Sequence, residues 1–266
     1  MQNIDPLYLI IPIVVIAFSF GIVIFWRKKR CFSRWVLLYS LLAYAGAIAL
    51  KYIVQIPTIN AVISASGHSP LVLGLYYGLQ TGVFEVGGAF LVASYAVSKG
   101  RFSSRDGGAF GLGLAMWENG VLLGATALIN YITYYVILGL PNSGISQTVY
   151  NALLQSTPYL FYEPAKALPY IGYSILERVS SLLGHFSWGF LAVWSAVYKR
   201  KYYFLVAFPI GFLIDFLVPF EARLGIGVFE LIVFAIAVAG LAAALTVTQG
   251  IRKNLISIGG SETATP

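Results

Sequence analysis

The chain has 266 residues, of which 59% are hydrophobic and only 10% are charged, and its mean hydropathy is +0.81. Soluble domains carry about 25% charged residues, so this composition excludes an ordinary soluble protein and indicates an integral membrane protein. The net charge of +7 is compatible with a nucleic-acid partner, but the positions of the charges, described below, favour another explanation.

Apolar stretches recur along the chain, and stretches of about 20 such residues are typical of transmembrane helices. In chain order they cover residues 7–27, 35–56, 70–98, 107–138, 168–198, 202–220 and 225–248. We therefore expect an all-α, polytopic bundle of about seven transmembrane helices, forming a single domain over residues 1–253. The basic cluster follows the first stretch instead of preceding it, so we interpret that stretch as an uncleaved anchor.

Two segments lie outside the predicted spans. Residues 139–167 form the one long loop, in which we expect a short interfacial helix at about 146–155. The polar residues 254–266 are predicted to be a disordered cytoplasmic tail.

Basic residues gather after alternate predicted helices. They lie at 27–34 after the first, 99–105 after the third, 199–201 after the fifth and 252–253 after the seventh. The intervening loops hold only Lys166 and Arg223. Because basic loops stay in the cytoplasm, this pattern predicts an outside N-terminus and a cytoplasmic C-terminus in a multi-pass protein of the cell membrane. The positive charge then reflects topology in a lipid bilayer, and no dedicated nucleic-acid-binding motif is present.

Four ionisable residues lie deep inside the apolar stretches: Glu85, Glu118, His185 and Asp215. Such groups cost several kcal/mol in a bilayer unless they are paired or hydrated, so they are candidates for a functional site. At a helical rise of about 1.5 Å per residue, each lies about 18–21 Å from the basic end of its helix. We therefore predict that all four share one polar layer near the bilayer midplane.

A second set of charged residues completes the predicted polar core and its surroundings: Lys51, Glu177, Arg178 and Glu230. Arg178 is spaced with Ser181 and His185 at i, i+3 and i+7, so we expect these three on one face that points into the bundle. For Arg178 we expect a snorkelling role or a salt bridge to Glu230 or Glu85. Lys51 needs a partner carboxylate or must reach the outer face.

Glycines form two stripes beside the glutamates. They are Gly74, Gly78 and Gly82 on the third predicted helix, and Gly113, Gly120 and Gly124 on the fourth. Small residues at this spacing allow close helix packing, so we expect these two helices to pack together and to bring Glu85 next to Glu118. Paired carboxylates with a histidine can activate water, either directly or through a metal.

Several segments of the chain resemble the YhfC family. They are residues 75–85 (LYYGLQTGVFE), 111–124 (GLGLAMWENGVLLG) and 176–179 (LERV) followed by His185, together with 54–57 (VQIP) and Asp215. That family is a polytopic group predicted to be intramembrane metalloproteases, related to the CAAX prenyl proteases, PrsW and the APH subunit of gamma-secretase. The resemblance implies catalytic roles for Glu85, Glu118 and His185.

The chain also departs from the family's motifs. Val86 and Ala89 replace a Glu and an Arg of the first motif, Leu114 replaces a His of the second, and Gly211 replaces a His before Asp215. Catalytic zinc sites use three protein ligands, so these losses predict a poorly coordinated metal.

The departures favour a non-catalytic function. We expect a scaffold, binding or channel subunit without a cofactor, working with other membrane proteins in a complex that transports protein or nucleic acid. One alternative is an active protease in which Glu85 or Glu118 is the general base, His185 stabilises the oxyanion and a divalent metal such as zinc is bound. Another is an ion- or proton-coupled transporter that uses the same carboxylates.

Overall fold

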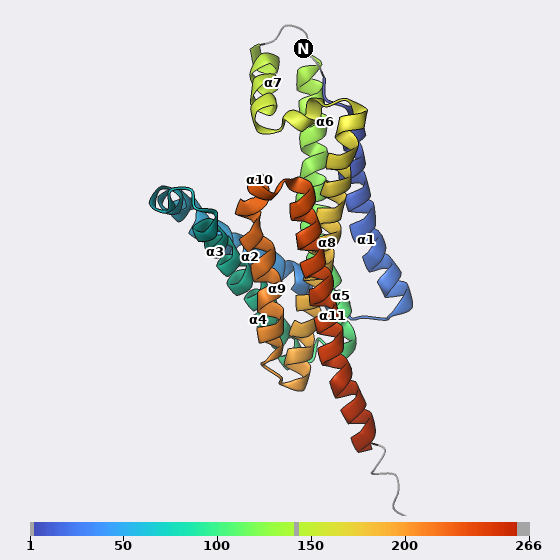
Figure 1. Ribbon diagram of the computed structural model, residues 1–266. Coiled ribbons are helices and arrows are strands. Elements are labelled where there is room, and N and C mark those ends of the chain that lie inside the picture. The colour runs from blue at the N-terminus through green and yellow to red at the C-terminus, as the bar shows by residue number, and fades with distance from the viewer. Residues whose placement is uncertain (1–2, 141–143, 260–266) are drawn as a thin grey trace, which may run out of the picture.

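The computed structural model describes residues 3–140 and 144–259, and within these ranges the regular elements are all helices (Figure 1). Their bounds are η1 Pro6–Leu9, α1 Ile10–Lys29, α2 Trp35–Ser66, α3 Pro70–Gln80, η2 Thr81–Val86, α4 Gly87–Ser98, η3 Ser104–Asp106, α5 Gly107–Ala115, η4 Met116–Ala125, α6 Thr126–Leu138, α7 Gly144–Ser156, η5 Pro158–Phe161, α8 Pro164–Tyr198, α9 Tyr203–Leu217, η6 Val218–Phe220, α10 Glu221–Leu224 and α11 Ile226–Gly259. The all-α prediction is confirmed.

Proline and glycine set several helix boundaries. Pro6, Pro70 and Pro164 each occupy the first turn of a helix, where the missing N–H costs no intrahelical hydrogen bond. At the C-terminal end of α2, Gly67 ends the helix with a positive φ of 56°, which glycine adopts without steric cost.

Two π-helical segments interrupt the third and fourth long helices. η2 lies between α3 and α4, and η4 lies between α5 and α6. In a π-helix the hydrogen bonds run from i to i+5, which widens the turn, and such segments are frequent at functional sites. η2 contains Glu85 and η4 contains Glu118, so the backbone deviates from α-helical geometry at both glutamates.

Six helical stretches of the described chain are long and apolar enough to cross a membrane. They are Pro6–Lys29, Trp35–Ser66, Pro70–Ser98, Ser104–Leu138, Tyr203–Leu224 and Ile226–Gln249. α8 is not among them because its polar residues, including Glu177, Arg178 and His185, lower its mean hydropathy. Figure 1 nevertheless shows α8 running between opposite ends of the bundle, so a seventh crossing stays a prediction.

α8 is the central element of the bundle. It contacts α4, α5, α9 and α11, and the side chains of its C-terminal half are mostly buried. Trp188, Leu191 and Ala192 of α8 belong to the main hydrophobic core, together with Val86 and Leu114 from the neighbouring helices. Several polar residues of α8, among them Ser180, His185 and Ser187, are buried against other helices.

The connections that carry the basic clusters lie at one end of the bundle. The backbone N–H of Ser33, between α1 and α2, donates to Oδ1 of Asp106, which follows α4, at 2.9 Å. Nearby, the guanidinium of Arg101 lies 4.4 Å from the ring centroid of Trp35. Figure 1 shows the α8–α9 connection at the same end. We call this the basic end; its cytoplasmic orientation remains a prediction.

The predicted packing partner of the glycine stripes is wrong. Cβ atoms added at Gly74, Gly78 and Gly82 would meet a ladder of aromatic residues on α9, namely Phe216, Phe212 and Phe208. The stripe at 113–124 instead lies against α1 and α2, near Ser19, Phe20 and Ser40. The broad rings fill the groove that the glycines leave, while α8 contacts both α4 and α5. The two glutamates are therefore brought together across α8.

The loop and the tail differ in outcome. α7 covers Gly144–Ser156, close to the expected interfacial helix at 146–155. α11 continues through residues 254–259, which we expected to belong to the disordered tail, and residues 260–266 lie outside the described part of the chain.

The aromatic ladder makes Gly78 sensitive to substitution. A Cβ at this position would lie 2.7 Å from the backbone oxygen of Phe212, so Gly78→Ala must push α3 away from α9. We expect a loss of about 1–3 kcal/mol in the free energy of unfolding, which is typical of overpacking. The measurement is the Tm in detergent, with Gly46→Ala as control because nothing lies within 4 Å of a Cβ there. Equal Tm values for the two variants would contradict this packing.

Candidate active site

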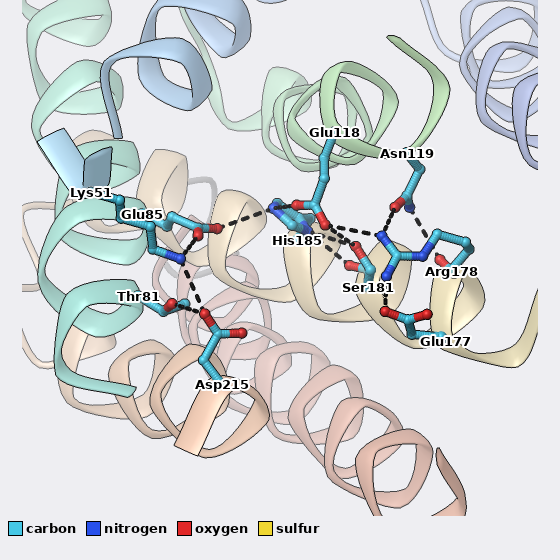
Figure 2. Close-up of polar contacts among 10 residues, drawn as sticks. All are labelled: Lys51, Thr81, Glu85, Glu118, Asn119, Glu177, Arg178, Ser181, His185 and Asp215. Atoms are coloured by element: carbon cyan, nitrogen blue, oxygen red, sulfur yellow. Dashed lines mark hydrogen bonds and ion pairs between the residues drawn. The ribbon is translucent and has the colours of Figure 1, made fainter. Parts of the chain in front are cut away.

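Glu85, Glu118 and His185 converge at the centre of the bundle (Figure 2). They come from η2, η4 and α8 respectively. Nε2 of His185 lies 2.9 Å from Oε2 of Glu118 and 3.5 Å from Oε2 of Glu85. One donor atom from each side chain lies within 4.8 Å of the other two. We call these three residues the triad.

The second polar atom of each triad residue is already bonded. Nδ1 of His185 lies 2.9 Å from the carbonyl oxygen of Ser181, one turn earlier on α8. A carbonyl only accepts, so Nδ1 carries a proton there and the lone pair of a neutral ring lies on Nε2. Nε2 lies within ion-pair distance of both carboxylates, so in the absence of a metal ion it carries a proton toward Glu118, and a bound metal ion would take the place of that proton.

The two carboxylates are oriented in the same way. Oε1 of Glu118 accepts from Oγ of Ser181 at 3.2 Å and from Nη1 of Arg178 at 3.4 Å. Oε1 of Glu85 binds the ammonium of Lys51. Each Oε2 is therefore left facing His185, and partners of this kind fix the orientation of metal ligands in known sites.

Asp215 joins the site through Lys51. The ammonium of Lys51 lies 3.1 Å from Oδ2 of Asp215, and Oγ1 of Thr81 donates to the same oxygen (Figure 2). Lys51 thus has carboxylate partners, which is one of the two arrangements expected from the sequence. Asp215 is linked to Glu85 by this shared cation.

Arg178 binds Glu118 and Glu177, so the expected salt bridges to Glu230 or Glu85 are wrong. Its Nη1 also donates to Oδ1 of Asn119 at 3.2 Å, and Nδ2 of Asn119 donates back to the carbonyl of Arg178 at 3.1 Å. This reciprocal pair holds α8 against η4. The predicted common face is confirmed, since Arg178, Ser181 and His185 all contact Glu118.

The triad is buried and rich in carboxylates. The side chains of His185, Glu85 and Glu118 are 4%, 10% and 17% exposed, and the rings of Trp188 and Tyr44 lie 4.3 Å and 6.2 Å from the imidazole. Three carboxylates of the network, at Glu85, Glu118 and Asp215, face the cations of Lys51 and Arg178 and the imidazole of His185. Buried charges are costly unless they are paired, so a site this rich in carboxylates favours a cation.

A divalent metal fits this donor set. Catalytic zinc sites commonly use three protein ligands drawn from imidazole and carboxylate groups, and the triad supplies one imidazole nitrogen and two carboxylate oxygens. A divalent cation would also be attracted by the two carboxylate oxygens that face Nε2 of His185.

A cavity of about 520 Å³ opens beside the triad. Glu85, Glu118 and His185 line one part of it, and Tyr170 and Glu230 line another. Ligand sites are typically cavities of about 300–1,000 Å³, so a substrate segment has room to reach the triad.

The positions that depart from the family's motifs pack beside the triad without adding a donor. Val86, Ala89 and Leu114 are buried in the hydrophobic core. A Cβ at Gly211 would lie 2.6 Å from Cγ2 of Val86, so this helix position belongs to the same apolar cluster.

Sequence reasoning missed several partners of the site. Thr81 precedes Glu85 by four residues, Trp188 follows His185 by three, and Asn119 is adjacent to Glu118. Residues three or four apart on a helix share a face, so the spacing of Thr81 and Trp188 was an available signal, whereas the position of Asn119 next to Glu118 was not. Tyr44, whose ring lies beside His185, comes from α2, and no spacing along the sequence links it to His185.

The shared cation makes Lys51 important for stability. Lys51→Met would leave Glu85 and Asp215 without their cation, and breaking a buried ion pair in this way costs about 3–5 kcal/mol. We expect a lower Tm in detergent for Lys51→Met, partly restored by the double variant Lys51→Met/Glu85→Gln, because the second change removes one orphaned charge. The control is Lys28→Met, at an exposed position of α1. Strictly additive losses in the double variant would contradict the pairing.

One of the comparisons with known proteins identifies a family for this chain. A family model described as YhfC intramembrane metalloprotease matches residues 13–236, a range that includes Glu85, Glu118, His185 and Asp215. No curated protein and no solved structure matches the chain. The family match covers well over half of the sequence, and the chain is a multi-pass membrane protein that belongs to the YhfC intramembrane metalloprotease family.

Proposed function

We propose that this protein is a metal-dependent intramembrane peptidase with its active centre at Glu85, Glu118 and His185. One observation carries the proposal: Nε2 of His185 and the Oε2 atoms of both glutamates face one another, while their other polar atoms are held by Ser181, Arg178 and Lys51. This arrangement favours an active site over the non-catalytic function that the sequence led us to expect.

The triad residues have distinct roles in this proposal. When bound, a divalent metal such as zinc polarises a peptide carbonyl and makes water a stronger nucleophile. His185 and Glu118, whose facing atoms are 2.9 Å apart, would be the principal ligands. Glu85 lies farther from Nε2, at 3.5 Å; its carboxylate would be the third and weaker ligand, and we assign to it the proton released from water. The neighbouring ammonium of Lys51 orients that carboxylate.

Metal content tests the ligand assignment. We expect about one divalent metal ion per purified chain, because the three donors form one site. His185→Gln and Glu118→Gln should lose it, whereas Glu85→Gln keeps an oxygen donor and should retain most of it. Elemental analysis of the protein in detergent makes the measurement, with Glu163→Gln, an exposed glutamate before α8, as control.

Cleavage of a fluorogenic transmembrane peptide tests the proton-transfer role. Glu85→Gln should lower turnover by about 100-fold or more while metal content is retained, as expected for the loss of a general base. A metal-free wild-type protein that also fails to cleave the peptide would count against the peptidase proposal.

A second candidate function is the non-catalytic scaffold or binding subunit of a membrane complex. Two observations favour it: Lys51 and Arg178 already provide cations to the carboxylates, and apolar residues fill the positions at Val86, Ala89, Leu114 and Gly211. A scaffold would co-purify with a stoichiometric membrane partner, and Glu118→Gln would leave that association unchanged.

A further inference from the structure

The cavity that reaches the triad has a second polar wall, formed by five residues that the proposed chemistry does not use. They are Glu177 of α8, Glu221 of α10, Glu230 of α11, Tyr159 of η5 and Tyr170 of α8. We call this set the acidic wall. It combines three carboxylates with two aromatic rings at the part of the cavity away from His185.

Glu230 is the feature of this wall that calls for a ligand. The residue is only 3% exposed, it lines the cavity, and its Oε2 makes no hydrogen bond among the described residues. Buried carboxylates normally have a cationic or hydrogen-bonding partner, because desolvation without one is costly. Arg178 lines the same cavity, but its ion pairs are with Glu118 and Glu177.

The aromatic residues of the wall favour an organic cation. The rings of Tyr159 and Tyr170 stack with centroids 5.7 Å apart and planes inclined by 10°, and Tyr162 packs edge-on against Tyr170. Faces of tyrosine rings attract ammonium and guanidinium groups, and this attraction strengthens where water is excluded. A carboxylate beside such rings recognises a Lys or Arg side chain, including its apolar stem.

The distance to the triad sets the position of that side chain in a substrate. Glu177 precedes His185 by eight residues on α8, which is about 12 Å at the helical rise. An extended peptide advances about 3.3 Å per residue, so 12 Å corresponds to about three or four residues.

We propose that the acidic wall binds a Lys or Arg side chain of the polypeptide substrate, three or four residues from the bond that lies at the triad. This inference rests on the proposed peptidase function, since it names the substrate class of the same site. It gives the enzyme a requirement for a positively charged residue near the cleaved bond.

Peptide binding tests the inference without requiring cleavage. The probes are two fluorescent transmembrane peptides of about 25 residues, which span a bilayer and differ only in Lys or Met at the fourth position from the centre. Their affinities for the full chain in lipid nanodiscs are measured by fluorescence anisotropy, with EDTA present. We expect the Lys peptide to bind at least about tenfold more tightly, as a desolvated charged hydrogen bond permits.

Variants assign that preference to the wall. Glu230→Gln should reduce the difference between the Lys and Met peptides to less than about threefold, and Glu221→Gln should weaken it in the same direction. Glu163→Gln, outside the cavity, should leave it unchanged. If Glu230→Gln does not fold, Tyr170→Leu tests the aromatic half of the same wall.

Three outcomes would overturn the inference. They are equal binding of the Lys and Met peptides, a Lys preference that survives both Glu230→Gln and Glu221→Gln, and a Glu230-dependent CaCl₂ site with no Lys preference. A protein with this preference but without metal or turnover would refute only the peptidase proposal. Turnover without the preference would refute only the acidic wall.

Discussion

The fold depends on the need to keep a buried imidazole and two buried carboxylates together inside a bundle that otherwise presents apolar surfaces to lipid. His185 faces Glu118 at 2.9 Å and Glu85 at 3.5 Å, and its other nitrogen is fixed by the carbonyl of Ser181. Groups of this kind are expensive in a low-dielectric interior, so their positions must be over-determined by the surrounding bonds. Arg178 fixes the carboxylate of Glu118, and Lys51 fixes the carboxylate of Glu85.

α8 makes the arrangement possible because it is the least apolar of the long helices and the most central. Its Arg178, Ser181 and His185 lie on one face and all reach Glu118. The cost of placing so many polar groups in one helix is limited because α4, α5, α9 and α11 surround it. The outward-facing side chains of the surrounding helices are largely apolar, and the polar side chains of the triad are buried between the helices.

The acidic wall and the triad lie along one cavity. Glu177 of the wall and His185 of the triad both belong to α8, so in the proposed function a rigid helix would set the spacing between a bound cation and the reacting bond. Sites on rigid elements hold their geometry more closely than sites on loops.

Much of this arrangement was predictable from the sequence. The apolar stretches predicted the membrane-spanning helices, and the depth of each ionisable residue along its helix predicted that Glu85, Glu118 and His185 lie in one layer. The α-helical spacing of Arg178, Ser181 and His185 correctly predicted a common face because α8 is a regular helix there.

The sequence failed where contacts depend on which helices become neighbours. The glycine stripe leading to Glu85 packs on the phenylalanines of α9, and no local pattern distinguishes that groove from one that fits another helix. The π-helical segments η2 and η4 were also missed, since periodicity assumes 3.6 residues per turn. Arg178 was assigned the wrong carboxylates because Glu177, its neighbour in sequence, was not considered as a partner.

The central claim is that the triad forms one metal site with a single histidine ligand. X-ray absorption at the zinc edge, measured on zinc-loaded protein in nanodiscs, tests it most directly. The account predicts one imidazole nitrogen with oxygen neighbours at about 2.0–2.2 Å, and loss of the imidazole signal in His185→Gln. A zinc shell of oxygen alone, or an imidazole signal that persists in His185→Gln, would contradict it.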